Sequence, residues 1–402
     1  MEFKLISGSP SDTVNIQQFN KYFYDNIILM APTVKSFGSD VKVKELLEFV
    51  DFHHNIMLFV NNESRKTVRE LANEFGVDFE DYGYTMQGGS APEGTTQGAF
   101  KMKNVSWSKS MFEPLVGEKK VFTALDRPVL FEDGVGALLD SETNNRHVFP
   151  ILRADQGAYS YNPEAPERKE TGIVSGNQLA LVSGYQTKYN QRIVISGSTK
   201  MCGNDAMLAN RDPAKDGSIE SSPNYILCTE MVEWNLMERG VLRMDNIRHN
   251  KVGDTWDGNY PENYKRQVDI EYFADFYLKQ NGKWVPLVAD DLQFQFTMLD
   301  PYYQVPLEQV DKSSPTYTYK LKTPWRLGIF KFVVDYKRYG LTQIDSSLEV
   351  SVIQLRHDEF PRYETTGYPY YVSVFVLMAS SFMFVTHFAF SDFSKVKGVK
   401  SA

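Results

Sequence analysis

Two cysteines and six histidines are the residues of this chain best suited to redox or metal chemistry. Cys202 and Cys228 lie far apart in the sequence, whereas a redox function would favour a Cys-x-x-Cys pair, which is absent. In an oxidising compartment they can form a disulfide, and the alternative is two separate buried thiols. His53 and His54 are adjacent, and neighbours on a helix point about 100° apart, which is poor for chelating one ion. The sequence therefore predicts no metal site and no cofactor.

Motifs for phosphate binding and hydrolysis are also absent from the sequence. The glycine-rich segment MQGGSAPEGTTQG, residues 86–98, lacks the Gly-Lys-Ser/Thr ending of a P-loop and the GxGxxG spacing of a dinucleotide site. No GxSxG elbow presents a nucleophilic serine. The net charge of −8 argues against a nucleic-acid partner, because nucleic-acid-binding surfaces are basic. We expect no catalytic residue.

Two Asn-x-Ser sequons, at Asn62 and Asn104, are candidate glycosylation sites. Short sequons arise often by chance, so they do not show in which compartment the chain resides. A glycan on either asparagine would nevertheless test a lumenal location.

The strongest pattern lies near the C-terminus. From Thr365 to Ser391 there is no Asp, Glu, Lys or Arg. Because roughly 20 apolar residues in a helix cross the hydrocarbon core of a bilayer, we predict one transmembrane helix at 368–390. The tyrosines at its start would form an aromatic belt at one interface. The alternative, a buried core helix, is disfavoured by the short polar segment 391–402 that follows.

One ionisable residue, His387, falls inside the predicted span. An ionisable group in lipid is costly unless it has a partner. His387 is therefore a candidate intramembrane contact within a helix bundle, and the alternative is a position at the lysine-rich interface.

The orientation of the span follows from the flanking cations. Three lysines lie in the segment 391–402, against Arg356 and Arg362 on the other side, so the positive-inside rule favours a cytosolic C-terminus. The opening MEFKLISGSPSDT lacks the basic start and apolar stretch of a signal peptide. Taken literally, this predicts a tail-anchored protein with a cytosolic body, and the alternative is an incomplete N-terminus.

The first part of the chain, residues 1–240, alternates between strand and helix patterns. The apolar runs at 26–30 and 56–60 are short enough to be buried strands, and each is followed by apolar residues at helical spacing. Strand-like runs recur at 178–186 and 192–198. Alternation of this kind predicts an α/β domain with a parallel sheet.

The period changes to two over residues 241–358. Alternating apolar and polar residues recur in several runs without intervening helices, and Asn281-Gly282 marks a tight turn between two of them. This pattern predicts an antiparallel β-sandwich immediately before the span.

Five blocks of the sequence resemble one known family, the 48 kDa subunit of the eukaryotic oligosaccharyltransferase (the DDOST family). The blocks are FYDNIILMAPTV with a following FG (23–38), RIVISGS (192–198), GVLRMDNIRHNKVGD (240–254), NGKWVPLVADDLQFQFTMLDPY (281–302), and GIFKFVVDYKRYGLTQIDSSLEVSVIQLRHDEFPRY with YPYYVS (328–373). They occur in family order over nearly the whole chain. The family's signal peptide and first strand have no counterpart before Glu2.

The resemblance implies a type I protein of the endoplasmic reticulum membrane with a lumenal body and a cytosolic tail. Such a protein is a non-catalytic, accessory subunit of the complex that transfers a preassembled glycan from dolichyl diphosphate to Asn in Asn-x-Ser/Thr. Its partners are the other subunits, including the catalytic multi-spanning one, and the lipid bilayer. The α/β domain is expected to be flavodoxin-like or amidotransferase-like.

Two other functions remain open at this stage. A membrane-anchored enzyme would carry a ligand pocket where the parallel strands end, and convergent titratable residues beyond Met30, Val60 and Ser198 would indicate it. A tail-anchored cytosolic adaptor would explain the missing signal peptide.

Overall fold

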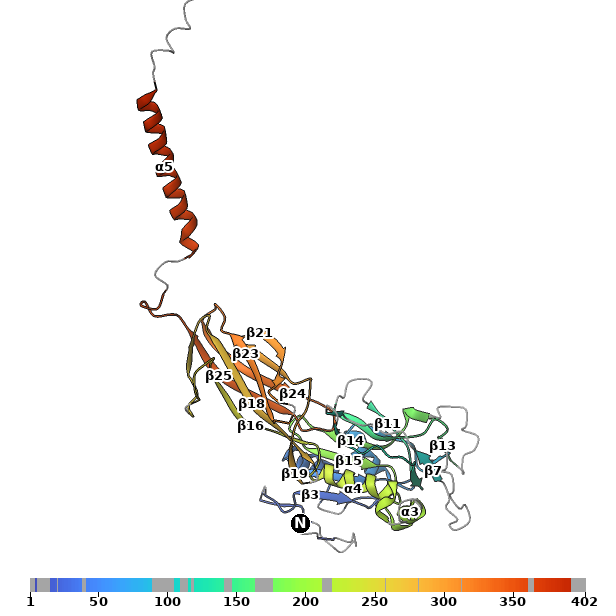
Figure 1. The fold of residues 1–402 in the computed structure, drawn as a ribbon. Helices are drawn as coiled ribbons and strands as arrows, with labels where there is room; N and C mark the ends of the chain where they lie inside the picture. Colours follow the sequence, from blue (N-terminus) through green and yellow to red (C-terminus); the bar gives the residue numbers. More distant parts are fainter. Residues whose placement is uncertain are drawn as a thin grey trace, which may run out of the picture.

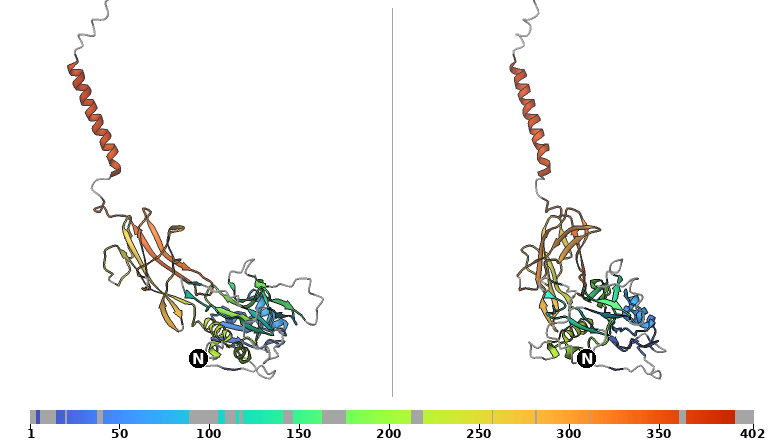
Figure 2. Two further views of the ribbon diagram at one scale, coloured as in Figure 1. Left: turned by 45° about the vertical axis from the view of Figure 1, so that its right-hand side comes forward. Right: turned by 90° about the vertical axis from the view of Figure 1, so that its right-hand side faces the viewer.

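The computed structural model describes residues 4–5, 15–19, 21–37, 41–88, 105–108, 115–116, 119–140, 147–162, 176–211, 219–256, 258–280, 282–311, 313–360 and 365–391. Three parts follow one another along the chain: an α/β part, a β-sandwich and a long C-terminal helix (Figure 1). In every view the sandwich lies between the α/β part and the helix (Figure 2).

The α/β part is built on a seven-stranded sheet in the order β3-β4-β15-β14-β11-β5, with β12 also paired to β14. These strands are β3 (Asn26–Leu29), β4 (Asn55–Phe59), β5 (Val77–Phe79), β11 (Ala137–Leu139), β12 (Val148–Arg153), β14 (Ala180–Gln186) and β15 (Arg192–Ser196). The predicted α/β class is confirmed, but only β3, β4 and β15 are mutually parallel. The other pairs are antiparallel. Strands β14 and β15 are joined by a short turn without a crossover helix, and a connection of that length allows only antiparallel pairing.

Three helices cover the two faces of this sheet. On one face, α1 (Val43–Asp51) and α2 (Lys66–Glu74) pack against alternate residues of β4, such as Ile56. On the other face, α4 (Pro223–Asn235) packs against the intervening residues, such as Met57. A strand buried on both faces explains the uninterrupted apolar run of β4.

Shorter elements complete the α/β part. They are β1 (Gln17–Gln18), β2 (Lys21–Tyr22), β6 (Thr85–Gln87), β7 (Val105–Ser108), β8 (Leu115–Val116), β9 (Lys119–Lys120), β10 (Val129–Glu132), β13 (Tyr159–Tyr161), η3 (Gly176–Gln178), α3 (Asn204–Ala209) and η4 (Ile219–Ser221). Strand β6 pairs with β13, so the glycine-rich segment begins as a strand rather than as a loop. Strands β6 and β13 are far apart in the sequence, so the local composition of the glycine-rich segment does not indicate that it pairs with β13.

The sandwich consists of two five-stranded sheets. One contains β16 (Val241–Lys251), β18 (Asp269–Gln280), β19 (Lys283–Pro286), β22 (Glu308–Gln309) and β23 (Thr316–Lys322). The other contains β17 (Asn263–Lys265), β20 (Gln293–Thr297), β21 (Pro301–Pro306), β24 (Gly328–Tyr336) and β25 (Ile344–Ile353). All pairs are antiparallel except β17 with β25, as the period-two pattern predicts. Aromatic rings fill the space between the sheets: the Tyr272 and Phe294 ring centroids are 4.7 Å apart.

The predicted span forms a single helix, α5 (Tyr368–Phe390), preceded by the 3-10 turn η5 (Thr365–Gly367). None of its residues is buried, and residues 365–390 are long and apolar enough to cross a membrane. The predicted helix is therefore confirmed as one that could span a membrane.

Candidate functional site

The carboxyl edge of the parallel strands, where such sheets usually bind ligands, is filled by the chain itself. Val60 is buried, and the Ser198 hydroxyl donates to the Glu132 carbonyl over 2.5 Å. A Cβ built on Gly197 would lie only 2.1 Å from the Val135 carbonyl oxygen, so there is no room for a side chain at this position. The backbone after β10 therefore packs directly against this edge of the sheet. Met30 is exposed beside it.

The nearest charged groups on this edge form an ion pair. Lys200 Nζ lies 2.6 Å from Asp133 Oδ2 and 3.4 Å from Glu132 Oε1. The hydrogen bond to Asp133 raises the pKa of Lys200, which favours the protonated form of the lysine. The pair ties the loop after β10 to the loop after β15.

A second group of titratable residues lies where β4 ends. Burial raises the pKa of Glu80 and lowers that of Arg69, whose Nε donates to the Ser64 carbonyl over 3.1 Å. A nucleophile would need a partnered base, but the Ser64 hydroxyl instead donates to Asn61 Oδ1 over 3.0 Å. The group therefore provides an acid and a cation, and the Glu80 carboxyl also has the Ser160 hydroxyl within hydrogen-bonding reach.

The two sequons differ in what the structure describes. Asn62 is half-buried in the turn after β4, and its carbonyl accepts a hydrogen bond from the Gly83 amide. Ser64 of the same sequon is buried. Asn104 lies outside the described residues.

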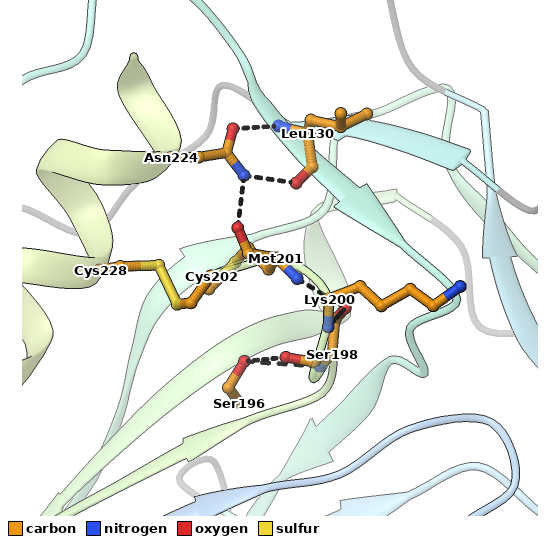
Figure 3. Close-up of a disulfide and its surroundings, with 8 residues drawn as sticks. All are labelled: Leu130, Ser196, Ser198, Lys200, Met201, Cys202, Asn224 and Cys228. Carbon is orange, nitrogen blue, oxygen red and sulfur yellow. Dashed lines mark hydrogen bonds between the residues drawn. A yellow bond between two sulfur atoms is a disulfide. The ribbon is translucent and has the colours of Figure 1, made fainter. Parts of the chain in front are cut away.

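Cys202 and Cys228 are joined in a disulfide, which links the loop after β15 to helix α4. Beside the bond, the Asn224 side chain accepts from the Leu130 amide and donates to the carbonyls of Leu130 and Met201 (Figure 3). The disulfide and this amide together attach α4 to the ends of two strands.

The histidines within the described residues are dispersed. His53 contacts the Gln191 side chain, and His147 Nδ1 lies 2.8 Å from the Gln186 carbonyl oxygen. His249 is buried in the sandwich with Nδ1 2.7 Å from the Tyr264 hydroxyl, and burial lowers its pKa to about 4. No group of three His, Cys, Asp or Glu among the described residues could hold a metal ion.

A buried cation, Arg192, occupies the junction between the α/β part and the sandwich. Its guanidinium donates to the carbonyls of Trp234, Arg239 and Gly240 over 2.6–2.8 Å and stacks 4.7 Å from the Trp234 ring. These carbonyls lie at the C-terminal end of α4 and beyond it, where the helix dipole favours positive charge. In the sequence Arg192 only opens a strand-like run, and a lone arginine at the start of an apolar run gives no signal that it is buried.

Further polar contacts cross the same junction. The Trp234 indole donates to the Gly340 carbonyl over 2.7 Å, and the Gln186 amide donates to the Leu341 carbonyl over 2.6 Å. Asn190 exchanges two hydrogen bonds with the Gln343 backbone. Because buried polar groups need partners in fixed geometry, these contacts hold the two parts in one arrangement.

In α5, His387 is exposed in the last turn of the helix. The described residues include none packed against it closely enough to bury it.

These features define a protein with a two-part folded body, held together by a disulfide and buried polar contacts, and one C-terminal helix that could span a membrane. Family models agree along most of the chain: the OST48 N-terminal domain matches residues 2–238, and the OST48 middle domain matches residues 249–392. The chain belongs to the OST48 family.

Three relatives carry the name dolichyl-diphosphooligosaccharide–protein glycosyltransferase 48 kDa subunit. The Arabidopsis thaliana protein is 31% identical over 389 residues, covering 96% of this chain and 85% of the relative. The Danio rerio protein is 30% identical over 373 residues, covering 92% and 81%. The Caenorhabditis elegans protein is 32% identical over 384 residues, covering 94% and 82%. The resemblance drawn from the sequence blocks is thus confirmed.

Proposed function

We propose that this protein is a non-catalytic structural subunit of the oligosaccharyltransferase complex. That complex would transfer a preassembled glycan from dolichyl diphosphate to Asn in Asn-x-Ser/Thr of nascent chains. The observation that carries the proposal is the similarity to three named 48 kDa subunits over more than nine-tenths of this chain.

The geometry of the α/β part supports a structural role rather than a catalytic one. The strand edge that would hold a ligand is covered by the loop after β10, and Ser198 donates to a backbone carbonyl there. The buried polar side chains, Arg192 and Asn224, bind backbone groups of other elements. These hydrogen bonds stabilise the packing of the elements against one another.

The proposal includes a location and partners. The body would lie in the lumen of the endoplasmic reticulum and residues 391–402 in the cytosol, with α5 in the lipid bilayer. The disulfide supports this orientation, because such bonds persist in oxidising compartments. Other subunits of the complex, including the catalytic multi-spanning one, would be the protein partners, and His387 is the proposed intramembrane contact.

We also propose the division of the chain into an α/β domain at 1–240, a β-sandwich domain at 241–358, a span at 368–390 and a tail at 391–402. The last helix of the α/β sheet ends at Asn235 and the first sandwich strand begins at Val241, which supports this first boundary.

Purification of the native protein in mild detergent is expected to retain other oligosaccharyltransferase subunits and transferase activity. The chain purified alone is expected to give no turnover with lipid-linked oligosaccharide and an acceptor peptide. Turnover by the isolated chain would overturn the non-catalytic role, and purification without any other subunit would overturn membership of the complex.

Glu80→Gln distinguishes the proposed role from that of an enzyme using the acid beside Arg69, with Asp81→Asn as the matched control. Complexes containing either variant are expected to keep wild-type activity, because the proposed structural role assigns no chemistry to Glu80 or to the Ser160 hydroxyl beside it. Loss of activity in Glu80→Gln alone would favour the enzyme.

In sealed microsomes, the body is expected to resist added protease while the tail is cut. Asn62 and Asn104 would then be available to the glycosylation machinery, so glycosidase should reduce the mass of any modified fraction. Digestion of the body without detergent would instead show a cytosolic, tail-anchored adaptor.

A further inference from the structure

Exposed apolar side chains gather at one end of the sandwich. We call it the distal end, because it lies opposite the junction with the α/β part (Figures 1 and 2). It is formed where β16 and β23 end and where β24 begins, together with the turn between β20 and β21. Its exposed apolar residues are Val252, Trp256, Tyr260, Met298, Leu299, Tyr302, Trp325, Leu327, Ile329 and Ile353.

The exposure at this end is large for a folded domain. Leu299, at the tip of the β20–β21 hairpin, is 95% exposed, and Trp325 is 63% exposed. Ile329 is exposed on β24 nearby. The rest of the sandwich surface shows far fewer such residues among those described: Trp284, Val310 and Tyr339. Apolar side chains concentrated at one end mark a contact surface.

The segment that leads to α5 leaves the sandwich from the distal end. Lys265 of β17 forms an ion pair with Glu359, and the Arg266 guanidinium lies 3.9 Å from the Trp325 ring centroid and 5.4 Å from that of Phe360. The chain is therefore attached to the distal end as far as Phe360.

The remaining connection to the span is short. Eight Cα–Cα steps separate Phe360 from Tyr368, the first residue of α5, and they reach at most about 28 Å when fully extended. Because Tyr368 begins the apolar helix and lies at the bilayer interface, the distal end must lie within that distance of the lipid surface.

We propose that the distal end inserts its exposed apolar side chains into the interfacial layer of the bilayer that α5 crosses. Tryptophan and tyrosine are the residues that favour this layer, and Leu299 would reach past them toward the acyl chains. Arg326 is exposed and can extend its guanidinium group to the headgroups while its stem covers apolar surface, whereas Arg266 packs against the Trp325 ring. Acidic residues such as Asp254 and Asp300 lie at the same end and offset the positive charge of the arginines. The proposed contact therefore does not depend on anionic lipids, and a bilayer of neutral phospholipid is enough to form it.

The contact has a mechanical consequence. A single helix joined by a short tether leaves a body free to tilt, whereas a second contact at the lipid surface limits that tilt. The α/β part, held to the sandwich by the Arg192 junction, would then be kept at one height above the membrane.

Tryptophan fluorescence of the full chain in phosphatidylcholine nanodiscs tests this contact, because α5 contains no tryptophan. Lipids brominated near the headgroup end of the acyl chain are expected to quench the emission relative to unbrominated lipids. The double variant Trp256→Phe with Trp325→Phe is expected to lose most of that quenching. The matched control is Trp284→Phe, because Trp284 is 43% exposed at the junction end, and it is expected to retain the quenching.

Equal emission in brominated and unbrominated nanodiscs would overturn the proposal, as would quenching that survives the double variant. If the distal tryptophans are unquenched in lipid but shift their emission when other subunits bind, the surface is a protein contact and the lipid proposal fails. The measurement needs no other subunit, so its outcome does not depend on the proposed function.

Discussion

Arg192→Met should lower the free energy of unfolding by about 3–5 kcal/mol, the largest loss we expect from one substitution in this protein. The guanidinium is fully buried and holds three backbone carbonyls at the end of α4. Methionine fills most of the volume but donates no hydrogen bond. The Arg239 carbonyl then loses its bond to the guanidinium, and the Trp234 and Gly240 carbonyls keep only the backbone amides of Met237 and Thr342. An unsatisfied buried polar group costs roughly 1–3 kcal/mol.

Thermal unfolding of the full chain in detergent would measure this loss, with limited proteolysis around residues 236–241 as a second readout. Arg192→Lys should fall between the wild type and methionine, because an ammonium keeps the charge but cannot span three acceptors. Arg243→Met is the matched control: Arg243 is exposed on β16 and pairs with Asp245 over 2.7 Å. Its replacement should change stability by less than about 1 kcal/mol. An unchanged melting temperature in Arg192→Met would show that Arg192 does not secure the junction.

Replacing Cys202 and Cys228 together by serine should destabilise the protein by about 3.5 kcal/mol. The disulfide closes a loop across a sequence separation of 26, and loop entropy in the unfolded chain gives a value of this size. The loss should concentrate around α4, since the bond attaches that helix to the loop after β15.

Melting temperature in the presence and absence of reductant provides the measurement. Reductant should lower the melting temperature of the wild type toward that of the double serine variant, and it should leave the variant unchanged. A variant that melts with the oxidised wild type would mean that Asn224 and the apolar packing of α4 suffice without the bond.

The junction matters for the proposed structural role, because a rigid connection between the sandwich and the α/β part keeps the two parts in a fixed arrangement. The distal end of the sandwich lies on the side of α5, and the α/β part lies at the opposite end (Figure 2). Trp234, Gln186 and Asn190 make hydrogen bonds across the junction in addition to Arg192. A protein that only tethered a flexible domain would have no need of so many buried polar contacts.

Local patterns in the sequence were sufficient for much of this protein. The apolar run of α5, the alternating residues of β18 and β24, and the helical spacing in α1 and α2 all form the predicted elements. Gly76 ends α2 with a φ of 75°, as its position after the last apolar repeat indicates. Each of these signals depends on which side of a single element faces water, and that information is contained in neighbouring residues.

The strand pairings and the buried contacts that depend on segments far apart in the sequence were decided by the tertiary structure. The antiparallel half of the main sheet comes from pairings of β11, β12 and β14, whose partners are set by the fold around them. Arg192 is buried because α4 and Gly240 close over it, and the distal apolar residues meet because separate loops converge. The sequence does not say whether a charged or apolar residue will be buried or exposed when that depends on distant segments. The role of such a residue therefore becomes clear only from the tertiary structure.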